Sequence, residues 1–182
     1  MIRLCSLSTS RATLLNEFGI DFIQSSSSYD EEQITTKVAR EFVYIASKGK
    51  LESSIKEFGL DLPLLCGDSV ISTSSGEILR KPKSLDEARE ILSKQSGDKI
   101  SIISSIHYQS KDYLFTDISA THYHFDKFDL DDLDRYLESN LWQGKAGGCM
   151  VEGFCKKYIR YVDGLESTAR GLQVEKLINW II

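Results

Sequence analysis

Residues 6–11, which read Ser-Leu-Ser-Thr-Ser-Arg, have the composition of an anion-binding turn. They join a short apolar run to a helical pattern, so the free N–H groups of a helix start lie beside hydroxyls and one guanidinium. That combination attracts phosphate groups. An ordinary helix N-cap at Ser8 or Thr9 also explains these residues. The sequence lacks a Walker-type Gly-x-x-x-x-Gly-Lys-[Ser/Thr] motif, which excludes the common phosphate loop.

Two groups of carboxylates could hold a metal ion or accept a proton. Asp68 interrupts an apolar run in the triplet Gly67-Asp68-Ser69. A carboxylate there is costly to bury unless it is paired or binds a metal. We expect a turn or bulge at Gly67 to direct Asp68 into a cleft, and a plain turn aspartate is the alternative. The acidic triplet at 30–32 supplies further carboxylates, although a solvated loop has the same composition.

Two lysines stand beside residues that shape the backbone. Lys145 precedes Ala-Gly-Gly, where adjacent glycines let the backbone approach a ligand closely, and Lys81 precedes a proline. Each segment taken alone is also an ordinary turn. His122 and His124 would share a strand face, but no third ligand lies at useful spacing, so zinc is not supported. Without a Gly-x-Ser-x-Gly elbow, a serine hydrolase is not supported either.

Length and composition limit the fold that can position these residues. The chain has 182 residues, a net charge of −5, and 41% hydrophobic and 27% charged residues. We expect one compact domain over 1–182, because the composition is that of a folded chain. No apolar run approaches the roughly 18 residues of a membrane span, and the first residues lack a signal-peptide pattern. The mild acidity disfavours duplex nucleic acid as a partner.

The cysteines indicate the compartment. None of the four (Cys5, Cys66, Cys149 and Cys155) forms a Cys-x-x-Cys pair. A chain of this size needs no disulfide framework. We therefore expect buried free thiols and a cytoplasmic protein.

Hydrophobic periodicity predicts the elements that must position the candidate residues. Strands are expected at 1–6, 21–24, 62–73, 77–79, 100–108, 114–125 and 158–162. Helices are expected at 9–18, 34–58, 84–95, 130–138 and 172–181, with an irregular glycine-rich stretch at 144–153. Because strands and helices do not alternate strictly, a mixed α/β sheet is favoured over a doubly wound parallel one.

The motifs are short, but their order along the chain is specific. They run Leu-Cys-Ser-x-Ser-x-x-Arg at the start, Cys-Gly-Asp-Ser-Val at 66–70, Gly-Glu-Ile-Leu-x-Lys-Pro at 76–82, Ser-Gly at 96–97 and Trp-Gln-Gly-Lys-Ala-Gly at 142–147. In this order they resemble the Maf family, the septum-formation-inhibitor-like nucleoside triphosphate pyrophosphatases. The resemblance covers nearly the whole chain.

The resemblance implies a fold and a reaction. The fold is α/β, with a mixed central sheet in two lobes around a nucleotide-binding cleft, as in inosine-triphosphate-pyrophosphatase-like proteins. The reaction converts a nucleoside triphosphate, or a modified nucleotide, to the monophosphate and pyrophosphate. The implied cofactor is a divalent metal, Mg²⁺ or Mn²⁺. The implied partner is a small-molecule nucleotide, and a homodimer is a possible assembly.

The resemblance also assigns roles to individual residues. The catalytic aspartate falls on Asp68, which would hold the metal together with Glu31. The substrate-binding positions fall on Arg11, Lys48, Lys81 and Lys145, and the turn adds the hydroxyls of Ser6 and Ser8. The positions that tune base choice fall on Ser10, Ser69 and Glu152.

The chain departs from the family pattern in ways that bear on its substrate. Thr-Ser-Arg at 9–11 stands for Pro-Arg-Arg, Val-Glu-Gly at 151–153 for Ile-Gln-Gly, and Gly-Leu-Gln at 171–173 for Gly-Leu-Pro. A glutamate at 152 resembles the 7-methyl-GTP branch, because a carboxylate can accept from N1 and N2 of guanine. A surface ion pair with Lys156 or Lys157 is the alternative. Because Thr-Ser-Arg contains one arginine where the family pattern has two, a non-catalytic, nucleotide-binding regulator of cell division is an alternative.

Overall fold

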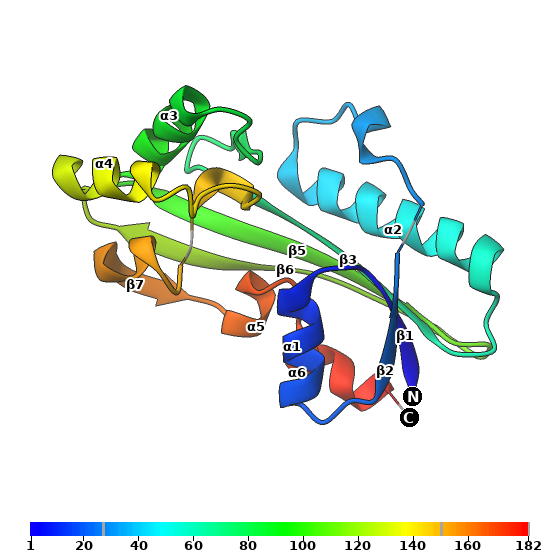
Figure 1. Ribbon diagram of the computed structural model, residues 1–182. Coiled ribbons are helices and arrows are strands. Elements are labelled where there is room, and N and C mark those ends of the chain that lie inside the picture. Colours follow the sequence, from blue (N-terminus) through cyan, green and yellow to red (C-terminus); the bar gives the residue numbers. More distant parts are fainter. Residues whose placement is uncertain (27, 150, 182) are drawn as a thin grey trace. The chain divides into compact units, whose positions relative to one another are not determined.

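The computed structural model describes residues 1–26, 28–149 and 151–181. Seven strands form one sheet in the order β2-β1-β3-β5-β6-β7, and β4 pairs with β3 off this path (Figure 1). The strands are β1 (Ile2–Cys5), β2 (Phe22–Ser25), β3 (Leu64–Ser72), β4 (Ile78–Leu79), β5 (Lys99–Gln109), β6 (Leu114–Phe125) and β7 (Ile159–Asp163). β1 runs parallel to β2 and β3, whereas β4 and β7 run antiparallel to β3 and β6. The predicted mixed α/β sheet is confirmed.

The helices connect these strands in the expected order. The α-helices are α1 (Thr9–Glu17), α2 (Ala39–Phe58), α3 (Leu85–Gln95), α4 (Leu130–Glu138), α5 (Glu166–Ala169) and α6 (Val174–Leu177). Short 3-10 helices lie at Glu31–Gln33, Ala146–Gly148, Phe154–Tyr158 and Ile178–Trp180. None of the helices in the described ranges is long and apolar enough to cross a bilayer.

Two compact units divide the chain. Unit 1 comprises Met1–Ser69, Ile103–Ala120 and Leu165–Ile182, and unit 2 comprises Val70–Ile102 and Thr121–Gly164. The chain passes from one unit to the other within β3, β5 and β6. Two units agree with the two expected lobes. The nucleotide-binding cleft stays a prediction.

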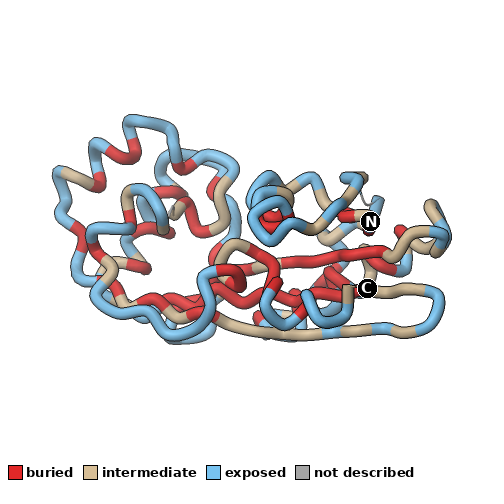
Figure 2. The backbone as a smooth tube through the Cα atoms, turned by 90° about the horizontal axis from the view of Figure 1, so that it is seen from below, coloured by how far each residue is buried: buried red, intermediate tan, exposed pale blue. Residues whose placement is uncertain are grey.

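Unit 1 is held together by apolar side chains that alternate along its strands. One set lies in a cluster with α1 and α6, and consists of Ile2, Leu4, Leu14, Leu15, Leu65, Ile106, Tyr108, Leu172, Val174 and Leu177. The intervening strand residues Cys5, Leu64 and Cys66 join Leu51 of α2 in a second cluster. Successive strand side chains point to opposite faces, so these clusters cover the two faces of the sheet. Figure 2 shows the resulting buried strands between exposed helix surfaces and turns.

Unit 2 is held by an aromatic cluster. Phe128 contacts the rings of Phe125, Phe154 and Tyr158, and Tyr136 of α4 stacks on Phe154 with ring centroids 4.4 Å apart. Stacked and edge-to-face aromatic pairs contribute beyond the area that they bury. The cluster therefore fixes the 3-10 turn at 154–158 against α4.

Two predicted boundaries were wrong. The long helix begins at Ala39 rather than at residue 34, because Thr36 Oγ1 accepts a hydrogen bond from Val38 N and donates one to Glu41 Oε2. Such local side-chain bonds compete with helix formation. The closing helix is divided into α6 and a 3-10 turn, and α5 was not predicted. The stretch 144–153 is irregular apart from its 3-10 turn, and position 150 lies outside the described residues.

Candidate active site

The turn after β1 is held by Arg11. Ser8 caps α1 by accepting from the backbone N–H of Arg11 at 3.4 Å. The Arg11 guanidinium donates to Ser6 Oγ at 2.9 Å, to the Gly171 carbonyl oxygen at 3.0 Å and to Ser69 Oγ at 3.2 Å. All three acceptors are neutral. No carboxylate of the described residues contacts this buried guanidinium directly, and its charge acts at longer range on Asp68 and Glu31.

Asp68 lies on the same strand as Ser69, and the expected turn at Gly67 was wrong. β3 runs without interruption from Leu64 to Ser72. A side chain at Gly67 would place its Cβ 3.4 Å from the Ser105 carbonyl oxygen and 3.5 Å from Arg11 Nε. These are ordinary van der Waals distances, so Gly67 is an extended strand residue with room for a small side chain.

A single lysine links the two predicted metal carboxylates. Lys50 Nζ lies 2.7 Å from Asp68 Oδ1 and 2.5 Å from Glu31 Oε1. Asp68 is only 6% exposed, and its second oxygen, Oδ2, is buried without a hydrogen-bond partner among the described residues. The structure thus brings Glu31 and Asp68 together around one cation, and it leaves one carboxylate oxygen available.

Lys48, the helical lysine expected to bind substrate, does not reach this cluster. Its side chain is 50% exposed and lies 3.8 Å from Glu52 on the same helix. Residues two positions apart on an α-helix point about 200° apart, so Lys48 and Lys50 cannot face the same way. Lys50 is the residue that sequence reasoning missed. The signal was its position one turn after the buried Ala46, on the apolar face of α2.

Glu31 lies beside α2, and the ring of Tyr29, two residues earlier, packs against Gly49 of that helix. Asp30 caps the 3-10 turn of Glu31 by accepting from Glu32 N at 2.9 Å. The ring of Tyr29 occupies the place that a Cβ on Gly49 would take. A side chain at position 49 would require the Tyr29 ring to move. Gly49 therefore lets the acidic segment lie directly beside Lys50.

The environment of Asp68 alters its acidity. Burial raises the pKa of Asp68, and the neighbouring carboxylate of Glu31 raises it further. The positive charges of Lys50 and Arg11 oppose this effect without cancelling it. A carboxylate with a raised pKa binds a proton more readily than an ordinary aspartate. Asp68 is consequently suited to accept a proton at its free oxygen.

Ser10 and Ser69 are the two predicted base-choice residues that lie in unit 1. Ser69 is already hydrogen-bonded, and Ser10 is exposed. Ser69 Oγ accepts from Arg11 and lies 2.7 Å from Ser104 Oγ, so its hydroxyl serves the framework around Asp68. Ser10 is exposed in the first turn of α1. Neither placement tests the expected role in base choice.

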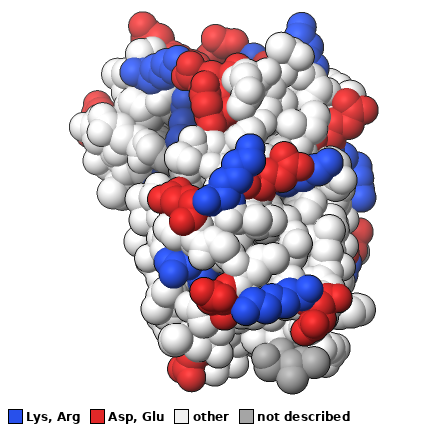
Figure 3. All heavy atoms as spheres, turned by 90° about the vertical axis from the view of Figure 1, so that its right-hand side faces the viewer, with Lys and Arg blue, Asp and Glu red and all other residues white. Residues whose placement is uncertain are grey.

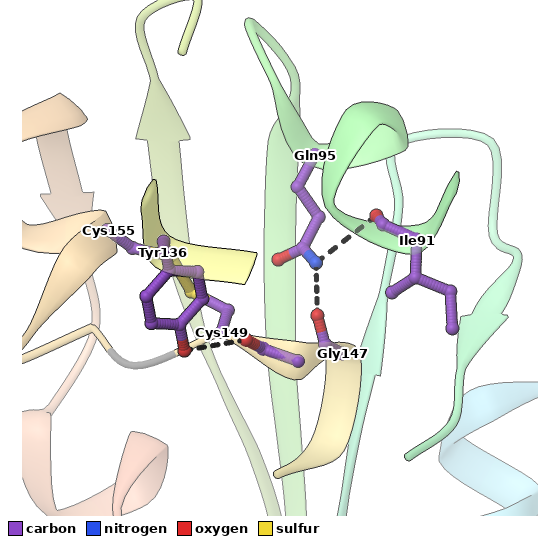
Figure 4. Close-up of a disulfide and its surroundings, with 7 residues drawn as sticks. Ile91, Gln95, Tyr136, Gly147, Cys149 and Cys155 are labelled. Atoms are coloured by element: carbon purple, nitrogen blue, oxygen red, sulfur yellow. Dashed lines mark hydrogen bonds between the residues drawn. A yellow bond between two sulfur atoms is a disulfide. The ribbon is translucent and has the colours of Figure 1, made fainter. Parts of the chain in front are cut away.

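Lys81, Lys145 and Glu152 lie in unit 2. Lys81 and Glu152 are exposed, and Lys145 is half-buried. Two hydrogen bonds to backbone carbonyl oxygens hold the turn after Lys145. Gln95 Nε2 donates to the Gly147 oxygen at 2.6 Å, and the Tyr136 hydroxyl donates to the Gly148 oxygen at 2.9 Å (Figure 4). The turn is thus a fixed part of this unit.

Two of the four cysteines were wrongly predicted to be free. Cys149 and Cys155 form a disulfide, which closes the segment that carries Glu152 (Figure 4). They lie six positions apart in sequence, and Tyr136 contacts a neighbour of each: its ring stacks on Phe154 and its hydroxyl donates to the Gly148 carbonyl oxygen. Cys5 and Cys66 are free and buried, as predicted.

Fold and site together describe an α/β protein with a buried carboxylate–lysine–carboxylate cluster beside an arginine-held turn. The profile of the family described as "Maf-like protein" matches residues 1–182, and the chain belongs to this family.

Named relatives are similar over nearly their whole length. The chain is 51% identical to a nucleoside triphosphate pyrophosphatase of a Nitratiruptor species, covering 97% of this chain and 96% of the relative. It is 38% identical to a nucleoside triphosphate pyrophosphatase of Helicobacter pylori, covering 96% and 91%. Among solved structures, a nucleoside-triphosphatase / dITP/XTP pyrophosphatase from Mycobacterium abscessus is 14% identical with a TM-score of 0.46, covering 98% of this chain and 90% of that one.

Proposed function

We propose that this chain is a nucleoside triphosphate pyrophosphatase, a hydrolase that cleaves an acid anhydride to release a monophosphate and pyrophosphate. The named relatives support this activity, and they favour it over a non-catalytic regulator of cell division. The observation that carries the proposal is the Asp68–Lys50–Glu31 cluster, in which a buried carboxylate has one free oxygen.

Asp68 acts as the general base in this proposal. A water molecule attacks the α-phosphorus, the bond to the bridging oxygen breaks, and pyrophosphate leaves. Asp68 Oδ2 takes the proton of the attacking water, which its raised pKa favours. The charges of Lys50 and Arg11 oppose the negative charge that develops on the phosphate oxygens. Lys50 takes the role that the sequence had assigned to Lys48.

The carboxylates fit a divalent metal. Glu31 and Asp68 offer hard oxygen donors around one cationic position, and one Asp68 oxygen lacks a partner. The described residues contain no group of three or more His, Cys, Asp and Glu side chains that could hold an ion. Mg²⁺ commonly uses one or two carboxylates and completes its shell with phosphate oxygens and water. When bound, Mg²⁺ or Mn²⁺ would supply positive charge to the substrate phosphates.

The partners form part of the same proposal. Net charge is −5, and on the face shown in Figure 3 lysines and arginines alternate with acidic side chains. A mixed surface of this kind suits a free nucleotide better than duplex nucleic acid. The Cys149–Cys155 disulfide removes the free-thiol argument for a cytoplasmic location. We propose an enzyme, compatible with a homodimer, in which Lys81, Lys145 and Glu152 contact substrate.

Product analysis tests the proposal. The protein is incubated with a panel of nucleoside triphosphates and Mg²⁺ or Mn²⁺, and the products are separated by ion-exchange chromatography. We expect equal amounts of monophosphate and pyrophosphate. Release of orthophosphate alone would contradict the reaction, and nucleotide binding without turnover under either metal would favour the non-catalytic alternative.

A further inference from the structure

Lys50 occupies the point at which Glu31 and Asp68 converge. Its ammonium contacts Glu31 Oε1 and Asp68 Oδ1, and its side chain is only 14% exposed. These are the two carboxylates that fit a divalent metal. In the metal-free protein, therefore, an internal cation already neutralises the ligands that the metal would use.

An ammonium and a divalent ion compete for these two carboxylates, even though Lys50 leaves Asp68 Oδ2 uncontacted. Two cations a few ångströms apart repel each other strongly, and partial burial weakens the screening of that repulsion by solvent. Asp68 is fixed in a buried strand, whereas Glu31 is 43% exposed and Lys50 has a stem with four carbons. The parts that can move are the Lys50 ammonium and the Glu31 carboxylate.

We propose that Lys50 is an internal counter-cation that competes with divalent metal for Glu31 and Asp68. It keeps the two carboxylates paired while the site holds no metal. When a metal binds, Lys50 leaves at least one carboxylate, and its ammonium becomes free to contact a triphosphate oxygen. This inference rests on the proposed metal site. It makes a prediction of unusual sign: neutralising a lysine in the active site tightens metal binding.

Lys48 provides a matched control. It lies two residues earlier on the same helix, and its nearest acidic partner is Glu52, outside the cluster. Lys48→Gln removes the same charge from the same helix without releasing Glu31 or Asp68. A difference between Lys48→Gln and Lys50→Gln therefore reports on contact with the carboxylates rather than on net charge.

The test measures Mn²⁺ binding to the nucleotide-free protein by electron paramagnetic resonance of free Mn²⁺, at fixed pH and ionic strength. Circular dichroism confirms folding, and Lys50→Met provides a second neutral variant if Lys50→Gln does not fold. We expect Lys50→Gln to bind Mn²⁺ about tenfold more tightly than wild type, Lys48→Gln to stay within about twofold, and Lys50→Arg to keep the weak wild-type affinity. Equal or weaker binding by the neutral variants at position 50 would overturn the competition.

A double variant shows where the ion binds. Lys50→Gln combined with Asp68→Asn should lose the gain in Mn²⁺ affinity, and tight binding that persists would place the ion elsewhere and overturn the inference. These measurements need no turnover. Absence of pyrophosphate from the wild-type enzyme would therefore refute the proposed function without deciding the competition, and an unchanged Mn²⁺ affinity would refute the competition without deciding the reaction.

Discussion

Asp68 shows how one residue can be both costly to bury and useful in catalysis. Removing a carboxylate from water costs several kcal/mol even after the protein relaxes. One positive charge at about 4 Å stabilises the carboxylate by about 4 kcal/mol at the effective dielectric constant of a protein surface. Lys50 in contact and Arg11 nearby are thus enough to keep Asp68 in a folded strand, although burial still raises its pKa.

Replacing Asp68 by asparagine should abolish turnover while leaving the fold intact. An amide cannot accept the proton of the attacking water, so kcat should fall by about 10²- to 10⁴-fold. The measurement is pyrophosphate release together with thermal unfolding of the variant. A folded Asp68→Asn protein that retains most of its activity would show that another group is the base.

We propose that Glu152 takes part in the choice of nucleobase. A carboxylate only accepts hydrogen bonds, so it matches the N1–H and N2–H donors of guanine. Facing the two carbonyls of uracil or thymine, it would leave acceptors unmatched at a cost of about 1–3 kcal/mol. We expect wild type to prefer 7-methyl-GTP to dTTP and UTP, and Glu152→Gln to shift the ratio of kcat/KM toward the pyrimidines. A wild type that prefers pyrimidines, or an unchanged ratio, would remove Glu152 from base choice.

At the scale of elements, α2 and β5 are joined by a buried polar contact next to the site. Ser47 of α2 donates to the Val43 carbonyl oxygen at 2.7 Å and lies 2.8 Å from Ser105 Oγ and 3.0 Å from His107 Nδ1. Ser47 is three residues before Lys50, so this contact helps to hold the helix in position over β3. Burial lowers the pKa of His107 to about 4, and the charge of Lys48 acts in the same direction.

This buried histidine predicts a loss of stability in mild acid. The folded protein keeps His107 neutral down to about pH 4, whereas the unfolded chain takes up the proton near its ordinary pKa of 6.5. The unfolded state therefore binds more protons between these values, and stability falls as the pH falls. From pH 7 to pH 5, wild type should lose about 2 kcal/mol more unfolding free energy than His107→Gln. Urea titrations of both proteins at the two pH values measure this, and equal losses would mean that His107 titrates normally.

At the scale of the whole molecule, each unit is assembled from segments distant in the sequence. Unit 1 combines three segments, and the Arg11–Gly171 hydrogen bond within it joins residues 160 positions apart. Unit 2 combines two segments and holds the disulfide. Contacts of this range depend on the whole chain being folded, because local structure alone does not bring the partners together.

Thiol counting tests the cysteine pairing of the whole chain. Of four cysteines, two form the disulfide and two are buried and free. Protein denatured without reductant should take up two alkyl groups, and protein reduced first should take up four. The native protein should react slowly, because Cys5 and Cys66 have no solvent exposure. Mass spectrometry after iodoacetamide treatment gives the count, and four groups without reductant would exclude the disulfide.

The sequence by itself determined the order of the strands and of the longer helices, and through the family resemblance it pointed to Glu31 and Asp68. Strand and helix periods are local properties, and capping residues such as Ser8 and Ser84 mark helix starts within a few positions. The ordered motifs identified the family because each motif is a run of neighbouring residues. For the same reason, the resemblance assigns candidate metal carboxylates to Glu31 and Asp68, and the structure brings these two side chains to one lysine.

Only the tertiary structure decided which lysine meets those carboxylates, how Gly67 is used and which cysteines pair. Lys48 and Lys50 lie on different faces of α2. The packing of α2 onto β1 and β3 decides which of these faces meets the carboxylates. Gly67 looked like a turn because glycine followed by aspartate is typical of turns, whereas the structure places it in the buried strand β3, near Arg11, Ser105 and Gly171 from other parts of the chain. Cys149 and Cys155 lie in a segment that Tyr136 of α4 contacts on both sides, through Phe154 and through the Gly148 carbonyl oxygen. Each of these outcomes depends on contacts between segments far apart in sequence, which local patterns do not encode.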